Sequence, residues 1–187
     1  MIHLHCTKKL QAKLPLHDTG RLKNKRPSPY AANDGPDSPL SGWHANRVLI
    51  QRRQCILFVH DATRFPVFIP ALKQADFAEL DYLFVDSFMN TLLKTGADDD
   101  LMHSAHAMLG PLVCDTDCNR SVQGTMNLMA REVGYYFEDH GVSVADITGY
   151  RVGAWLADRP CTVKGIKDCI WPQRAMHELL DSQGNKR

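Results

Sequence analysis

The chain has 187 residues and a nearly balanced charge, with 22 lysine and arginine residues against 21 aspartate and glutamate residues. Its hydrophobic content of 44% is near the norm for globular proteins, which excludes a collagen, a coiled coil and a largely disordered chain. At this length a core needs neither a disulfide nor a metal to be stable. We therefore expect one domain over residues 1–187.

No stretch approaches the roughly 20 apolar residues that a membrane helix needs, and the N-terminus lacks the apolar core of a signal peptide. We therefore expect a cytoplasmic protein that has no membrane contact. The six cysteines are then expected to be free thiols, because a reducing compartment disfavours disulfides.

The balanced total charge hides an asymmetry along the chain. Residues 1–60 hold ten basic and three acidic residues, a net charge of +7, whereas residues 61–187 hold twelve and eighteen, a net charge of −6. The basic residues are densest over 8–26. Such a region can bind nucleic acid or an acidic protein, but it is also typical of a solvated helix face with a basic loop, or of a segment neutralised by acidic helices.

The N-terminal third has the pattern of a small sheet. Apolar residues alternate with two histidines over residues 2–6, which predicts a half-buried strand, and a short helix can follow over 8–14. Residues 15–42 are rich in proline and glycine and predict a long basic loop. Three further strands are predicted over residues 44–50, 54–59 and 65–69. The last is expected to be an edge strand because prolines flank it.

After Pro70 the hydrophobic period changes from two to about 3.6 residues, which predicts helices. These are expected over residues 74–95, 101–109, 121–140, 144–156 and 172–180. Strands followed by helices favour the α+β class. The predicted fold is a small, mostly antiparallel sheet of about four strands in the N-terminal third, packed against C-terminal helices.

The familiar catalytic and nucleotide-binding motifs are missing from the sequence. It contains no phosphate-binding glycine loop, no dinucleotide-binding fingerprint and no nucleophile elbow. His5-Cys6 invites comparison with the cysteine phosphatases, but Ala12 stands where their arginine would follow. We therefore reject that class.

A zinc site is the metal centre to consider, because zinc accepts thiolates and imidazoles. The candidate ligands are Cys114, Cys118, His103 and His106. Their spacing is looser than that of a zinc knuckle, and the simpler interpretation is two histidines on a helix surface and cysteines as small core residues or exposed thiols. We expect neither a metal nor another cofactor.

Polar residues at the ends of the predicted strands are candidates for a functional site, because a rigid sheet positions the loops that follow it. Asp61, Thr63 and Arg64 follow the most apolar strand, where the alternative is an ordinary turn. Trp43 and Asn46 lie in the preceding strand, where the tryptophan can stack on a ring or belong to the core.

The start of the long helix over 121–140 is a further candidate. Arg120 precedes it and can hold an anion near the helix amides, whereas the alternative is an ordinary N-cap formed by Asn119 or Ser121. Asn127 is an unusual choice inside a helix and points to a specific polar contact.

Several of these segments resemble an uncharacterised bacterial family that is described only as a domain of unknown function. The matching motifs are HCTKKL at 5–10, WHAN at 43–46, LFVHDATRF at 57–65 and NRSVQGTMN at 119–127. The proline-rich segment at 15–40 is longer than the family leads us to expect. The resemblance implies a bacterial or mobile-element protein and supports one domain, but it implies no reaction.

Two functions compete on these observations. The basic N-terminal third favours a non-enzymatic binding or regulatory module for nucleic acid or an acidic protein, with contacts from Lys8, Lys9, Trp43, Asn46, Thr63, Arg120 and Asn127. The alternative is a hydrolase or nuclease-like enzyme with a cluster at the end of the sheet, whose candidate catalytic residues are His5, His44, Asp61 and Arg64. We favour the binding module from the sequence and expect the enzyme only if these groups share one pocket.

Overall fold

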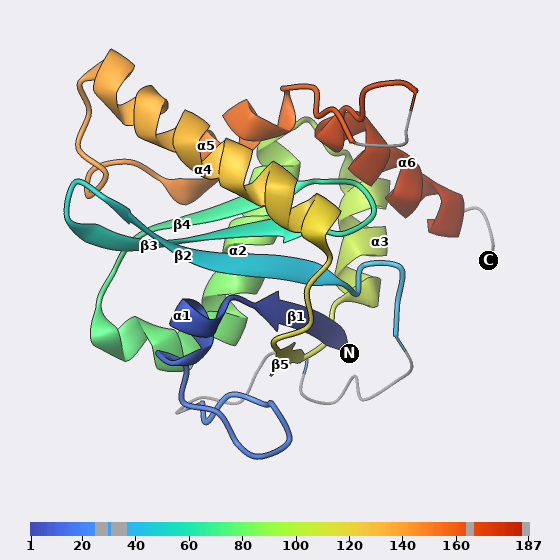
Figure 1. The fold of residues 1–187 in the computed structure, drawn as a ribbon. Helices are drawn as coiled ribbons and strands as arrows, with labels where there is room; N and C mark the ends of the chain where they lie inside the picture. The colour runs from blue at the N-terminus through green and yellow to red at the C-terminus, as the bar shows by residue number, and fades with distance from the viewer. Residues whose placement is uncertain (25–29, 31–36, 164–166, 185–187) are drawn as a thin grey trace.

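The computed structural model describes residues 1–24, 30, 37–163 and 167–184 (Figure 1). Much of the predicted proline-rich loop, at 25–29 and 31–36, lies outside the described residues. Among the described residues, no helix is both long enough and apolar enough to cross a membrane.

One five-stranded sheet organises the chain, with strand order β4-β3-β2-β1-β5. Its strands are β1 (Ile2–Cys6), β2 (Trp43–Ile50), β3 (Arg53–His60), β4 (Pro66–Leu72) and β5 (Leu112–Asp115). The strands β2, β3 and β4 form an antiparallel meander, as their alternation and short connections predict.

The α+β class is confirmed, but the sheet differs from the prediction in two respects. It has five strands rather than about four, because β5, formed by residues that follow Gly110-Pro111, adds to its edge. It is also mixed, because β1 runs parallel to both of its neighbours, β2 and β5. A parallel pair requires a long connection, and residues 7–42 supply one between β1 and β2.

Helices cover both faces of the sheet (Figure 1). After the short α1 (Lys8–Gln11) and the 3-10 turn η1 (Gln74–Glu79), the helices are α2 (Leu80–Lys94), α3 (Asp99–Met108), α4 (Arg120–His140), α5 (Gly149–Ala157) and α6 (Pro172–Gly184). Two hydrophobic cores result. One lies between the first face of the sheet and helices α2, α3 and α6, and the other lies between the second face and helices α4 and α5.

The face toward α4 changes character across the sheet. Over β3 and β4 it is apolar, with Leu57, Val59 and Phe68 packed against α4 and α5. Over β1 it carries histidines, because Ile2, Leu4 and Cys6 of that strand point to the opposite core. On this face, the apolar packing against α4 and α5 therefore covers β3 and β4, and polar side chains occupy the part over β1.

Candidate functional site

A row of polar side chains crosses three neighbouring strands on the face toward α4. His5 of β1 lies opposite His44 of β2 on one side and opposite Asp115 of β5 on the other. Val59 of β3, the strand partner of His44, belongs to the α4 core. Because paired residues on adjacent strands share a face, the strand register brings these three groups together from distant parts of the sequence.

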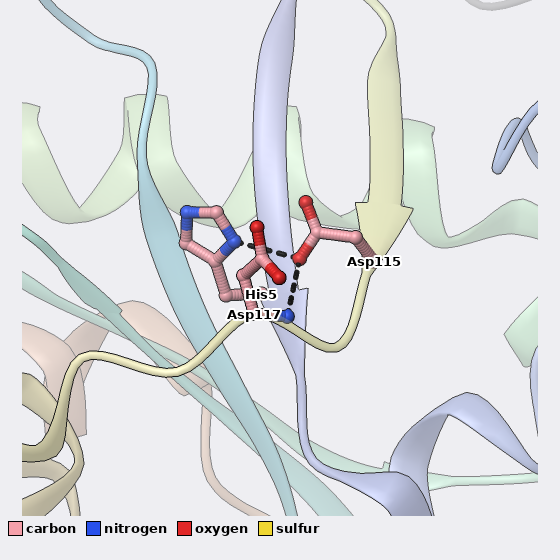
Figure 2. Close-up of side chains that lie close together, drawn as sticks. All are labelled: His5, Asp115 and Asp117. Atoms are coloured by element: carbon pink, nitrogen blue, oxygen red, sulfur yellow. Dashed lines mark hydrogen bonds and ion pairs between the residues drawn. The ribbon is translucent and has the colours of Figure 1, made fainter.

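His5 has a carboxylate at each of its ring nitrogens. Its Nδ1 lies 2.7 Å from Oδ1 of Asp115, as Figure 2 shows. Its Nε2 lies 3.7 Å from Oδ2 of Asp61, which follows the end of β3. The side chain of His5 is 19% exposed, so the imidazole is largely sheltered and still reachable from solvent.

His44 fixes the position of Asp61. Its Nδ1 lies 2.7 Å from Oδ1 of Asp61, and its Nε2 lies 2.8 Å from the backbone nitrogen of Asn119. A backbone N–H can only donate, so Nε2 of His44 accepts, and the ring proton of a neutral imidazole is then on Nδ1. His44 therefore donates to Asp61 and is tied to the residue that precedes α4. Both ring nitrogens are occupied, which leaves it no free atom for a substrate.

Asp117 completes a tight group with His5 and Asp115. Its backbone nitrogen donates to Oδ1 of Asp115 over 2.9 Å. One ligand atom from each of the three side chains lies within 4.8 Å of the other two, the only such group of three or more in the described part of the chain. Figure 2 shows both carboxylates close to the imidazole of His5. Histidine and aspartate are common ligands of divalent metals, so this group can hold one.

A pocket of about 260 Å³ opens beside the group. Its walls come from the end of β1, from α1, from β2, from the β5–α4 connection and from α4. The residues are His5, Cys6, Thr7, Lys8, His44, Thr116, Asp117, Cys118, Gln123 and Met126. The hydrogen bond with Cys114 and burial raise the pKa of Cys6, so this thiol stays protonated. The groups of the pocket that remain able to react or to bind a charge are the imidazole of His5, the carboxylate of Asp117, the amine of Lys8 and the exposed thiol of Cys118.

Arg64 lies close to this region but turns toward the start of α4. It is buried, and its Nη2 donates to Oγ of Ser121 over 3.3 Å. Its Nε and Nη1 have no hydrogen-bond partner among the described residues. Burial lowers the pKa of Arg64, and the nearby carboxylate of Asp61 opposes that change. Arg64 is therefore close enough to Asp61 to interact with its charge, but it does not form part of the pocket wall.

Three other predicted site residues are buried in structural contacts. The indole of Trp43 donates to the carbonyl of Leu40 and lies between the rings of core residues. Asn46 accepts a hydrogen bond from Oγ1 of Thr7. The hydroxyl of Thr63 bonds Nδ1 of His60 in the turn after β3. None of these three reaches the pocket.

The predicted contacts on the helices are exposed. Lys8 reaches the pocket, whereas Lys9 lies outside it on α1. Arg120 and Asn127 are exposed on α4. The side chain of Asn119 accepts from the amides of residues 121 and 122, so the first turn of α4 has an ordinary N-cap. Binding by these four exposed residues stays a prediction.

The structure does not bring the four zinc candidates together. Cys114 is buried in β5 and faces the core opposite His5. Cys118 is exposed at the pocket, where its thiol donates to Gln123. His103 is exposed on α3 and bonded to a backbone carbonyl of its own helix, and His106 lies against the ring of Tyr30.

Sequence reasoning missed Asp115 and Asp117. Asp115 ends the four-residue strand β5 and Asp117 follows it, between a Gly-Pro pair and a helix cap, and so short a strand has no clear period. The spacing of the two aspartates, directly after Cys114, is the one feature of the sequence that could have marked them as neighbours of a sheet end.

The comparisons with known proteins agree with the resemblance found in the motifs. No curated protein and no solved structure matches the chain. One family model, described as a domain of unknown function (DUF6933), matches residues 3–175, which include every side chain of the cluster. The chain therefore belongs to the DUF6933 family.

Proposed function

We propose that the chain is a hydrolase whose reaction takes place at the cluster of His5, Asp61, Asp115 and Asp117. The observation that supports this most is the imidazole of His5, which has a carboxylate on each side and forms part of a pocket wall. An imidazole oriented by one carboxylate and facing a second is the arrangement that proton transfer during hydrolysis needs.

This proposal reverses the order of the two functions favoured by the sequence. A binding module needs only charged or aromatic contacts, and it gives no reason for three carboxylates to surround one histidine. The four predicted catalytic residues do not all reach the pocket, but His5, His44 and Asp61 are linked by contacts of 2.7 and 3.7 Å. The sequence favours the enzyme only if the four groups share one pocket. His5 and His44 line it, whereas Asp61 and Arg64 do not, so this condition is met only in part.

Three side chains of the cluster have a defined role in the proton transfer, and the fourth, Asp117, lines the pocket beside them. Asp61 accepts a proton from the attacking water, and Nε2 of His5 is placed to relay that proton to the leaving group. Asp115 orients the imidazole through Nδ1. His44 is a positioning residue, because its two ring nitrogens are taken by Asp61 and by the backbone before α4.

The substrate class that fits the pocket is a phosphate ester. Lys8 supplies a cationic group at the pocket, and an ammonium can hold a phosphate oxygen as a point charge. The volume of about 260 Å³ admits a small organic group beside the cluster. In this reaction water would attack the phosphorus, the bond from phosphorus to the ester oxygen would break, and an alcohol would be released.

The test is hydrolysis by the purified full chain of three chromogenic esters: p-nitrophenyl phosphate, bis(p-nitrophenyl) phosphate and p-nitrophenyl acetate. We expect release of p-nitrophenol from a phosphate ester, and a loss of at least about 100-fold in kcat/KM for His5→Gln, because proton transfer typically contributes that much. The matched control is His103→Gln, which replaces an exposed histidine on α3.

Equal activity of the His5→Gln and His103→Gln variants would show that His5 takes no part. Turnover of the acetate alone would replace the phosphate ester by a carboxylic ester as the substrate class. If no ester is turned over while the folded protein binds nucleic acid in a gel-shift experiment at low salt, the binding module is the better account.

A further inference from the structure

We infer that His5, Asp115 and Asp117 bind one divalent transition-metal ion, of the Mn²⁺ to Zn²⁺ series, at the carboxyl ends of β1 and β5. This deepens the proposed function by naming a cofactor for the same cluster, although the binding itself does not depend on turnover. It differs from the zinc site considered from the sequence, because it uses none of those four residues.

The first support is the donor set. The three side chains offer one imidazole nitrogen and two carboxylate oxygens, which all lie within 4.8 Å of one another. Ligand atoms at about 2.1 Å from one ion are about 3 to 4 Å apart, so a small inward movement of the side chains completes the site. An imidazole favours a transition metal, whereas magnesium and calcium prefer sites made of oxygen alone.

The second support lies outside the three ligands. A histidine that binds a metal through one nitrogen usually directs the other toward a carboxylate, which fixes the orientation of the ring. Here Nδ1 of His5 faces the carboxylate of Asp115, and Nε2 faces Asp61 at 3.7 Å. Asp61 is itself held by His44, whose second nitrogen is fixed by the backbone of Asn119. The chain thus holds an outer shell in place around His5.

The third support is charge. Asp61, Asp115 and Asp117 lie around one imidazole, and no lysine or arginine in the described part of the chain pairs with any of them within 4.0 Å. Carboxylates gathered in this way repel one another unless a cation lies between them. The adjoining pocket leaves room for the water or substrate that completes the coordination of an ion.

With an ion bound, Nδ1 of His5 would be a ligand, and the single proton of the neutral imidazole would stand on Nε2, directed toward Asp61, so the ring loses no proton. His5 would then act as a ligand and not as a proton relay. The ion would lower the pKa of a bound water, whose proton Asp61 is placed to accept.

The experiment titrates the full chain, first freed of metal with EDTA, with MnCl₂ alone, and follows free Mn²⁺ by its EPR signal. We expect one saturable site per chain, with echo modulation from a directly bound imidazole nitrogen. Asp117→Asn and Asp115→Asn should each weaken the affinity at least about tenfold, and Asp61→Asn about 10- to 100-fold as an outer-shell change. Asp146→Asn, at an exposed site far along the chain, is the matched control and should bind as the wild type does.

The inference is overturned if no saturable site is found below about 1 mM Mn²⁺, if the modulation from nitrogen is missing, or if Asp117→Asn binds as tightly as Asp146→Asn. The Asp117 side chain is exposed, so its substitution leaves the fold intact and the comparison valid. Binding without ester hydrolysis would support the metal site and contradict the hydrolase. Hydrolysis that persists in EDTA, in a protein that binds no Mn²⁺, would support the hydrolase and contradict the metal site.

Discussion

His60 ends β3, one residue before Asp61, and is fully buried. Its ring packs on Trp43, and its Nδ1 bonds the hydroxyl of Thr63. Burial lowers its pKa from the ordinary value of 6.5 to about 4, an effect that the carboxylate of Asp61 only partly opposes. The folded protein therefore holds this imidazole neutral, beside a site that is exposed to solvent.

The buried His60 predicts that the protein loses stability in mild acid. Between pH 6.5 and about 4 the unfolded chain takes up a proton at this residue that the folded chain refuses. Its contribution is present above pH 6.5 and is lost as the pH falls toward 4, by on the order of 3 kcal/mol. The measurement is urea unfolding at pH 7.5, 6 and 5.

The His60→Gln variant separates this effect from other acidic and basic groups. Glutamine does not titrate, so the decline in unfolding free energy with falling pH should be shallower than in the wild type, whatever the stability at pH 7.5. The control is His103→Gln, which removes an exposed histidine. A decline of unchanged slope in His60→Gln would show that His60 is not the group responsible.

At the scale of single residues, the sequence predicted part of the site. His5, His44 and Asp61 were marked by their position at strand ends, which is a local property. Asp115 and Asp117 were not, because their role depends on the pairing of β5 with β1, more than 100 residues apart. Trp43 and Thr63 were marked for the same local reason as His5, but burial gave them structural contacts instead.

At the scale of elements, α5 is held unusually close to β4, the strand at one edge of the sheet. A methyl group on Gly149 would lie 2.0 Å from the carbonyl oxygen of Phe68, and one on Gly153 would lie 2.9 Å from Thr91 of α2. These two glycines weaken the sequence pattern of a helix, and the structure gives the reason for them. A larger residue would force the helix away from the strand.

We expect Gly149→Ala to lower the free energy of unfolding by at least about 2 kcal/mol, because the clash is with rigid backbone. Gly134→Ala in α4 is the matched control, since a methyl group there meets nothing within 4 Å. It should instead stabilise the protein, by up to about 1 kcal/mol, through its helix propensity. Equal effects of the two substitutions in chemical denaturation would contradict the close approach of α5.

The helices and the antiparallel strands were predictable because their hydrophobic periods extend over many residues. The helix over 121–140 is found as α4 at Arg120–His140, with Tyr136 and Phe137 in the core and Tyr135 exposed. The helix expected over 144–156 begins later, at Gly149, because Val144 to Thr148 form a turn. The parallel pairing of β1 was beyond prediction, since strand direction is set by the long connection that follows it.

At the scale of the whole molecule, the charge asymmetry of the sequence bears directly on the site. The basic N-terminal part supplies His5, Lys8 and His44, whereas Asp61, Asp115 and Asp117 come from the acidic remainder. The cluster therefore lies where the two unlike parts of the chain meet in the sheet. Among the described residues, the carboxylates of the site are faced by histidines of the basic part and not by its lysines or arginines, so the self-neutralising arrangement stays a prediction.

A double-mutant cycle on His5 and Asp61 tests the central claim most directly, because it asks whether the two side chains act as one unit. We expect His5→Gln to lower kcat/KM for the phosphate ester at least about 100-fold, and Asp61→Asn at least about tenfold. The double variant should have about the same kcat/KM as the less active of the two single variants, because the effects of residues that share a step are not additive. Losses that multiply in the double variant, or full activity in Asp61→Asn, would contradict a shared site.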